Sequence, residues 1–243
     1  APNVISGLQA RGIQVVLASG RPMFSVASIA HQLGISPGPL VALNGAHIRH
    51  ADKSEGFQSI GSILDWEAGI AQTIAAGFVV NLYTASHWLN SDHKHKATQH
   101  EIAQMGRLPD GTISERNLPP SEQILKLFVQ KENIQTEVLP WRPSGLHCYR
   151  SGNSVDLVAF EQTDLGYEPV SKRHGLSKIL GNTTALSSVL AFGDGDNDAQ
   201  MLAHVGYGVT MKNGDERAIE SADHVIEPGP NSILRFLTET FGL

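Results

Sequence analysis

Short apolar runs, each followed directly by a polar turn that contains glycine, constrain the fold of this chain most. Their uninterrupted hydrophobicity is typical of strands buried on both faces of a parallel sheet. A helical spacing of apolar residues from Val26 to Leu33 separates the first two runs. We therefore predict an α/β fold in which helices cover a parallel sheet. The three runs are residues 13–18 (IQVVLA), 40–43 (LVAL) and 188–192 (SVLAF).

The middle of the chain follows a different pattern, with Gly- and Ser-containing turns and a polar, histidine-rich stretch. We predict an inserted α+β domain over residues 51–167, and a core domain made of residues 1–50 and 168–243 whose two segments share one sheet. The other predicted elements are a helix at the start of the chain, helices over about 62–76, 175–180 and 199–204, and strands over 78–83 and 207–211.

Composition and charge exclude several classes of protein. Hydrophobic residues make up 41% of the 243 residues and charged residues 17%, the balance of a folded globular chain. The net charge of −6 and the lack of a basic run argue against nucleic acid as a partner. No apolar stretch approaches the roughly 18 residues that span a bilayer, and a single cysteine, Cys148, forms no internal disulfide. We expect a cytoplasmic protein that binds neither nucleic acid nor a membrane; nothing in the sequence indicates its oligomeric state.

The strongest local signal is the acidic segment 193–198 (GDGDND) directly after an apolar strand. Its carboxylates, Asp194, Asp196 and Asp198, repel one another unless a hard cation such as Mg²⁺ lies among them. Ligand sites of open α/β sheets lie at this end of the strands. An EF-hand loop would need glycine where Ala199 stands, and a dinucleotide-binding loop would need it where Asp198 stands. An acidic turn without a ligand is the alternative.

Other positions have both a functional and an ordinary structural interpretation. Gly20 lets backbone N–H groups approach an anion while the Ser19 hydroxyl donates to it, although Ser-Gly before a helix is also a common cap. Asn44, followed by glycine, is more often part of a simple turn. Lys172 at the start of a helical segment would neutralise a phosphoryl group, yet solitary surface lysines are far commoner.

Taken together, four segments resemble the haloacid dehalogenase (HAD) superfamily in sequence and in order, and more narrowly its Cof-type phosphatases of subclass IIB. They are residues 15–22 (VVLASGRP), 43–46 (LNGA), 170–172 (VSK) and 191–202 (AFGDGDNDAQML). Residues 205–237 also resemble the family. The resemblance implies a Rossmannoid parallel-sheet core with a cap domain inserted after the Asn-Gly strand.

The resemblance also implies a Mg²⁺-dependent phosphatase that acts on small phosphorylated metabolites, such as sugar phosphates, through an aspartyl-phosphate intermediate. Asp194 would ligate the metal, and Asp198 would support the metal shell directly or through water. Lys172 would balance the charge between the phosphate and the nucleophile, which makes Lys172, Asp194 and Asp198 the catalytic candidates. The candidates for phosphate binding are Ser19, Gly20, Asn44, Lys172 and Asn197.

One element of the family pattern does not occur in the chain. The family carries its nucleophile in a D-x-D-G-T motif on the strand before the first helix, and the 243 residues, which begin Ala1-Pro2, contain no such motif. We expect an upstream segment to supply the nucleophile, and we expect these 243 residues alone to be inactive and poorly stable because strand edges stay open. The alternatives are an inactive phosphate-binding or regulatory protein, a fragment of a P-type ATPase, and a mutase with the same type of cap.

The predicted cap domain carries further candidate residues. His93 and His95 have the spacing of a chelate, but scattered exposed histidines are the interpretation that we favour. Tyr83, His87 and Trp88 are candidates for substrate specificity, with packing inside the cap domain as the favoured alternative.

Overall fold

The chain folds into two compact units. The computed structural model describes residues 2–35, 37–114, 118–132, 139, 141, 145–151, 153–163, 166–181 and 186–243. The outer unit comprises Ala1–Gly56 and Ser171–Leu243, and the middle unit comprises Phe57–Val170. The predicted domain boundaries, after residues 50 and 167, lie a few residues before the observed boundaries, which follow Gly56 and Val170. They differ because β4 (Glu55–Phe57) begins in the outer unit beside β3 (His47–Arg49), whereas β13 (Gly166–Pro169) pairs with a strand of the middle unit.

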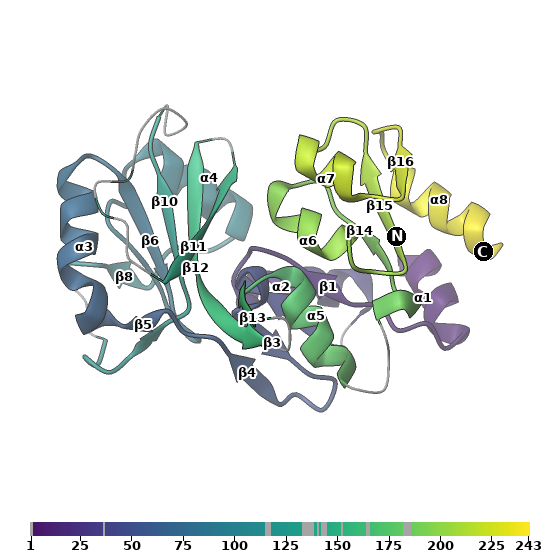
Figure 1. Ribbon diagram of the computed structural model, residues 1–243, viewed down its shortest axis with the longest axis horizontal. Helices are drawn as coiled ribbons and strands as arrows, with labels where there is room; N and C mark the ends of the chain where they lie inside the picture. Colours follow the sequence, from purple (N-terminus) through teal and green to yellow (C-terminus); the bar gives the residue numbers. More distant parts are fainter. Residues whose placement is uncertain are drawn as a thin grey trace. The chain divides into compact units, whose positions relative to one another are not determined.

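Two sheets, one mixed and one parallel, form the centre of the outer unit (Figure 1). The first sheet has the order β1-β2-β3-β4, and β1 and β2 are parallel. In the second sheet, of order β14-β15-β16, all pairs are parallel. The remaining elements of this unit are α1 (Pro2–Ala10), β1 (Leu17–Ala18), α2 (Met23–Leu33), β2 (Leu40–Ala42), the 3₁₀ turn η1 (Leu43–Gly45), α5 (Lys172–Leu180), η4 (Leu186–Ser188), β14 (Leu190–Phe192), η5 (Asp196–Asp198), α6 (Ala199–Leu202), β15 (Tyr207–Met211), α7 (Glu216–Ser221), β16 (His224–Ile226) and α8 (Ser232–Phe241).

The α/β class is confirmed by this arrangement, but the prediction of one shared sheet is wrong for the described residues. Within them, β1 pairs only with β2 and β14 only with β15, so each is an edge strand. The first strand is also shorter than residues 13–18, because only Leu17 and Ala18 pair with a neighbour. Both sheets nevertheless share a core, since Val16 and Ala18 pack against a cluster that includes Ala191 and Leu202.

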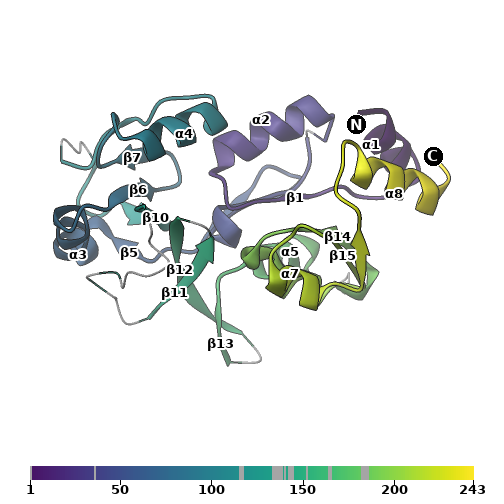
Figure 2. The same cartoon turned by 90° about the horizontal axis from the view of Figure 1, so that it is seen from above.

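Local sequence explains where the helices of the outer unit begin and end. Gly34 ends α2 in the left-handed conformation, with φ of 75°, as expected for a glycine at a helix C-terminus. Helix α5 begins at Lys172, three residues before the predicted start at Gly175, because the Ser171 hydroxyl caps it by accepting from His174 N. Helices α1 and α8 lie side by side, which brings the first and last helices of the chain together (Figure 2).

The middle unit is built on an antiparallel sheet of order β11-β12-β10-β6-β7-β8, extended by β13 beside β12. Helix α3 matches the predicted helix over 62–76, and a small pair of strands, β5 and β9, adjoins it. Its elements are β5 (Gly61–Ser62), α3 (Ile63–Ala75), β6 (Val79–Tyr83), β7 (Trp88–Asn90), α4 (Lys96–Met105), β8 (Gly111–Thr112), β9 (Gln123–Ile124), β10 (Lys126–Gln130), β11 (Leu146–Ser151) and β12 (Ser154–Thr163).

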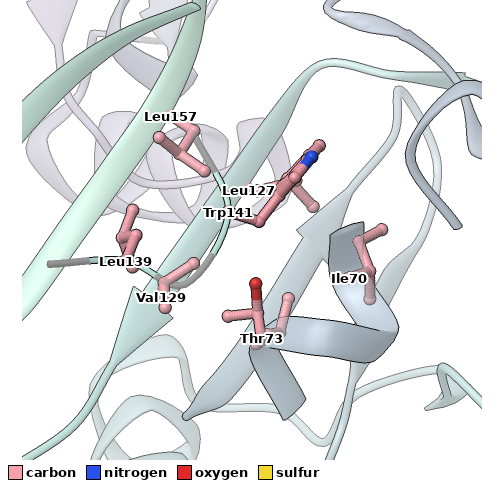
Figure 3. Close-up of a pocket in the computed structure, with 8 residues that line it drawn as sticks. Ile70, Thr73, Leu127, Val129, Leu139, Trp141 and Leu157 are labelled. Atoms are coloured by element: carbon pink, nitrogen blue, oxygen red, sulfur yellow. The ribbon is translucent and has the colours of Figure 1, made fainter. Parts of the chain in front are cut away.

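One face of the middle sheet packs against α3. Ile70 and Thr73 of α3 lie over Leu127, Val129 and Leu157, and this contact forms an apolar hollow (Figure 3). Its described lining, which also includes Val80, Leu139 and Trp141, contains no titratable side chain. The hollow is therefore part of the hydrophobic core and not a site for chemistry. No helix in the described part of either unit is long and apolar enough to cross a bilayer.

Candidate active site in the outer unit

Loops at the carboxyl ends of β1, β2 and β14 converge in the outer unit with the first turn of α5. The loops after β1 and β14 and the first turn of α5 border a cavity of about 360 Å³ whose polar lining includes Ser19, Lys172, Asp194 and Asp198. Side chains of β1, β14, β15, β16 and α8 form its apolar wall. The location agrees with the general rule that ligands of α/β sheets bind beyond the carboxyl ends of strands. The apolar lining residues are Ala18, Phe192, Val209, Met211, Ile226 and Ile233.

The three carboxylates of the acidic loop differ in their burial and in their partners. Asp198 is buried; its Oδ2 accepts from Asp194 N at 3.2 Å and Gly195 N at 3.1 Å. Asp196 forms an ion pair with Arg217. Asp194 is exposed, and its carboxylate has no hydrogen-bond or ionic partner among the described residues. Only Asp194 therefore combines a place on the cavity wall with a carboxylate that no protein donor engages.

Lys172 is placed by the first turn of α5 and buried beside the acidic loop. Its Nζ donates to Asp198 Oδ1 at 2.7 Å and to Asn197 Oδ1 at 3.3 Å. Both members of the ion pair are more than nine-tenths buried. A charge-assisted bond of this length in a low-dielectric surrounding fixes the ammonium group at one position on the cavity wall.

Ser19 and Gly20 follow β1 directly, as the motif predicts. Ser19 N donates to Val41 O at 2.9 Å, and Ser19 Oγ accepts from Arg21 N at 3.2 Å. The Ser19 hydroxyl hydrogen has no acceptor within the described chain, and Ser19 lines the cavity. The loop therefore presents a hydroxyl donor to whatever anion enters.

Asn44 and Asn197 join the two sequence segments of the outer unit. Asn44 is fully buried in η1, and its Oδ1 accepts from Asn197 Nδ2 at 2.8 Å. A methyl group on Gly20 would lie 2.9 Å from Asn44 Oδ1, so the Ser19–Gly20 loop packs against this bond. The structure thus brings all seven predicted site residues together in one unit. Four of them line the cavity, and Gly20, Asn44 and Asn197 lie outside its described lining.

The chemistry of this cluster fits a hard cation with oxygen ligands, supplied here by Asp194. Asp198 is engaged by Lys172 and two backbone N–H groups, so its carboxylate orders the loop whether or not a cation is bound. No three His, Cys, Asp or Glu residues in the described part of the chain gather closely enough to hold a metal by themselves. A cation at Asp194 would accordingly need further ligands from water, from the substrate or from another segment.

Thr210, on β15, is a polar residue of the cavity wall that sequence reasoning missed. It is 2% exposed, and its Oγ1 has no hydrogen-bond partner in the described structure. A buried hydroxyl without a hydrogen-bond partner lowers the stability of the folded protein. Such groups are therefore unusual in native proteins. The sequence offered one indication of this position: a lone threonine between Val209 and Met211 in the predicted strand over 207–211.

The predicted candidates of the middle unit have mainly structural environments. Trp88 and Tyr83 are buried and stack with ring centroids 6.0 Å apart, which is core packing. His93 Nε2 lies 3.1 Å from Gly111 O, and the His95 ring accepts from Ala97 N at the start of α4. Sequence reasoning also missed a buried ion pair in this unit, Lys126 Nζ to Asp156 Oδ1 at 2.8 Å.

Comparison with known proteins identifies the family. A profile of the haloacid dehalogenase-like hydrolases matches residues 2–236. The chain is 26% identical over 226 residues to the HMP-PP phosphatase of Serratia proteamaculans, covering 86% of this chain and 75% of that protein. It is 23% identical over 246 residues to the 5-amino-6-(5-phospho-D-ribitylamino)uracil phosphatase YitU of Bacillus subtilis, covering 99% and 90% of the two chains.

Among solved structures, a sugar phosphatase of HAD subclass IIB superposes with a TM-score of 0.78 at 20% identity, covering 99% of this chain and 90% of the other. This similarity shows the fold. The profile spans nearly the whole chain. The chain therefore belongs to the haloacid dehalogenase-like hydrolases, and it is an enzyme of their phosphatase group.

Proposed function

We propose that this protein is a Mg²⁺-dependent phosphatase that hydrolyses small phosphorylated metabolites, such as sugar phosphates. One observation carries the proposal: of the three carboxylates in the acidic loop, only Asp194 has no partner among the described residues, and it lines a cavity together with the buried ammonium group of Lys172. The substrate class is supported by relatives named for small phosphorylated molecules and by the resemblance to a subclass IIB sugar phosphatase.

Each candidate residue of the outer unit would have a different role in binding a phosphoryl group. Asp194 would hold Mg²⁺, and when bound the cation neutralises charge on the transferring phosphoryl group. The Ser19 hydroxyl and the Gly20 backbone would donate to phosphate oxygens. Lys172 would place its positive charge beside the same oxygens, next to Asn197, while Asp198 keeps the ammonium group in position.

We further propose that the nucleophile is an aspartate on a segment outside these 243 residues. Its carboxylate would attack phosphorus, the alcohol of the ester would leave, and water would then hydrolyse the aspartyl-phosphate to orthophosphate. Two features support a strand from such a segment between β1 and β14. Each of these strands has an unpaired edge within the described residues, and the cavity beside them is lined by apolar side chains that a strand would cover.

We also propose a cytoplasmic location, with a small phosphorylated molecule and neither nucleic acid nor a membrane as the partner. The charge of −6 and the single cysteine support this part of the proposal.

A phosphate-binding protein without turnover is the second candidate. It is favoured by one specific observation: the candidate groups for binding phosphate lie together in the described chain and are held in place by hydrogen bonds among themselves. The two candidates differ in whether phosphate esters are consumed.

Phosphate release by the full-length gene product, measured over a panel of phosphate monoesters with and without Mg²⁺, tests the proposal. We expect turnover that depends on Mg²⁺ and that Asp194→Asn reduces by about 10²-fold or more. Asp196→Asn is the matched control, because Asp196 is paired with Arg217 in the same loop; this variant should keep most of the activity.

The outcome separates the candidates. Binding of orthophosphate without hydrolysis of any ester would favour the second candidate. Equal losses in Asp194→Asn and Asp196→Asn would contradict the assignment of Asp194 as the metal ligand.

A further inference from the structure

The turn that follows β2 has an unusual backbone conformation for its sequence. Leu43, Asn44 and Gly45 all have positive φ, at 50°, 58° and 100°. A left-handed conformation is tolerated by asparagine and glycine but is rare for leucine. Such strain persists only where the surrounding structure fixes it, and it is common near functional sites.

Close approach to α5 explains why the turn keeps this conformation. A methyl group on Gly45 would lie 2.2 Å from Ser171 O, and one on Gly175 would lie 3.1 Å from the Gly45 Cα. The turn is therefore in direct backbone contact with the start of α5, next to Lys172. A change in the turn would move the residue that carries the ammonium group.

The side chain of Asn44 makes the second connection. Its Oδ1 accepts a hydrogen bond of 2.8 Å from Asn197 Nδ2, and its backbone N donates to Ser19 O at 3.0 Å. One buried residue thus connects the Ser19 loop, through its backbone, with the acidic loop, through its side chain, although Asn44 and Asn197 are 153 residues apart in sequence.

This bond determines which way the amide of Asn197 faces. Because Asn44 offers an acceptor, Asn197 points its NH₂ group toward Asn44 and its Oδ1 toward Lys172 Nζ, at 3.3 Å. The flipped amide would oppose two acceptors on one side and two donors on the other. Asn44 thereby keeps an acceptor facing the lysine, whose Nζ also donates to Asp198.

We propose that Asn44 is a positioning residue that acts through Asn197 on Lys172, and that it does not bind the phosphate itself. The proposal rests on the proposed function, because it assigns a role within the same site. Its physical content is a chain of hydrogen bonds from Asn44 to Asn197, then to Lys172 and Asp198. Loss of the first bond frees the Asn197 amide to rotate and lets the ammonium group shift.

Asn44→Gly in the full-length gene product tests this role, since glycine keeps the positive φ while removing the acceptor. We expect kcat for a phosphate monoester to fall about 10- to 100-fold, because small misplacements of a charge-balancing group have effects of this size. KM should change little, since the phosphate-binding groups remain. Asn231→Gly is the matched control: Asn231 is an exposed asparagine with φ of 65°, and its variant should behave as the wild type.

A double-mutant cycle with Asn197→Ala shows whether Asn44 acts through Asn197. In that background Asn44→Gly should cause no further loss of kcat, because the residue that it orients is gone. Multiplicative losses would overturn the proposal. A raised KM with unchanged kcat in Asn44→Gly would also overturn it, because that pattern identifies a direct phosphate ligand.

Side-chain amide NMR of the wild-type protein gives a readout that needs no turnover and no foldable variant. We expect the Asn197 NH₂ protons to exchange slowly with water because Asn44 accepts from them. Fast exchange in the folded protein would contradict the proposal. If the wild type hydrolyses no phosphate ester, the proposed function fails, whereas this measurement still decides the orientation of Asn197.

Discussion

Each unit of the molecule contains a buried lysine–aspartate pair, and the two pairs have nearly the same length. Lys172 and Asp198 of the outer unit lie 2.7 Å apart, and Lys126 and Asp156 of the middle unit lie 2.8 Å apart. Burial and distance alone therefore do not distinguish a catalytic pair from a structural one. The two pairs differ in the groups that surround them.

The outer pair is surrounded by further polar groups and borders a cavity. Asp198 also accepts from two backbone N–H groups, and Lys172 also donates to Asn197. The middle pair lies on the sheet beside aromatic rings instead, with Lys126 Nζ 5.6 Å from the ring centroid of Tyr83 and 5.3 Å from that of Phe128. We infer that the first pair orders a reactive loop, whereas the second holds two strands together.

Removing either lysine separates the two roles. We expect Lys172→Met to lower kcat about 10²- to 10³-fold, since it removes a cation that stabilises developing charge. Lys126→Met should leave kcat per folded molecule nearly unchanged. Both variants should lose about 3–5 kcal/mol of unfolding free energy, because each removes the lysine partner of a mostly buried aspartate. Steady-state kinetics and urea unfolding of the full-length protein measure the two effects. An equal loss of kcat in both variants would contradict the distinction.

Removing both partners of a pair shows whether other groups depend on its aspartate. Lys126→Met with Asp156→Leu should recover most of the stability that Lys126→Met loses, since apolar residues often replace a buried ion pair without net cost. Lys172→Met with Asp198→Leu should remain destabilised by about 1–3 kcal/mol for each backbone N–H group that loses its acceptor. Recovery in both doubles, measured by urea unfolding, would show that the acidic loop does not depend on Asp198.

The pH dependence of stability should differ between the units. Burial lowers the pKa of His47 in the outer unit below its usual 6.5, although Glu55 opposes this shift. The unfolded chain then binds the proton more readily, so His47 should reduce stability as pH falls below about 6.5. Burial raises the pKa of Tyr83 in the middle unit, so Tyr83 should reduce stability as pH rises above about 10.

Urea unfolding over a pH series measures the free energy of unfolding in both ranges, the acid limb below about pH 6.5 and the alkaline limb above about pH 10. His47→Gln should flatten the acid limb only, and Tyr83→Phe the alkaline limb only. An unchanged acid limb in His47→Gln would show that another group causes it.

The smallest effect concerns the unpaired hydroxyl of Thr210 in the cavity wall. Thr210→Val keeps the shape and removes the unpaired group, so we expect about 1 kcal/mol of added stability. Thermal unfolding without ligands checks this. A loss of stability instead would mean that the hydroxyl has a partner in solution.

Motifs that are local in sequence could be predicted well. The strand Tyr207–Met211 and the helix Ile63–Ala75 match their predictions closely, because apolar periodicity marks each of them. The acidic loop could be assigned to the end of a strand because three carboxylates follow an apolar run. Its location in the fold needed no long-range information.

Interactions between distant segments could not be predicted. The Lys126–Asp156 pair depends on the register of β10 against β12, which places Phe128 opposite Asp156. The Asn44–Asn197 bond depends on a strained turn that propensity disfavours for Leu43. The division of the outer strands into two sheets depends on which edges pair, and apolar character alone does not set pairing.

Orthophosphate binding in the presence of Mg²⁺ reports on the candidate phosphoryl site of the outer unit without requiring turnover. Isothermal titration of the full-length wild type, Lys172→Met and Lys126→Met gives the comparison. We predict one bound phosphate per chain in the wild type and in Lys126→Met, and weakening of about tenfold or more in Lys172→Met, which loses a charge-assisted contact. Unchanged binding in Lys172→Met, or loss of binding in Lys126→Met, would contradict the assignment of the outer unit as the phosphoryl site.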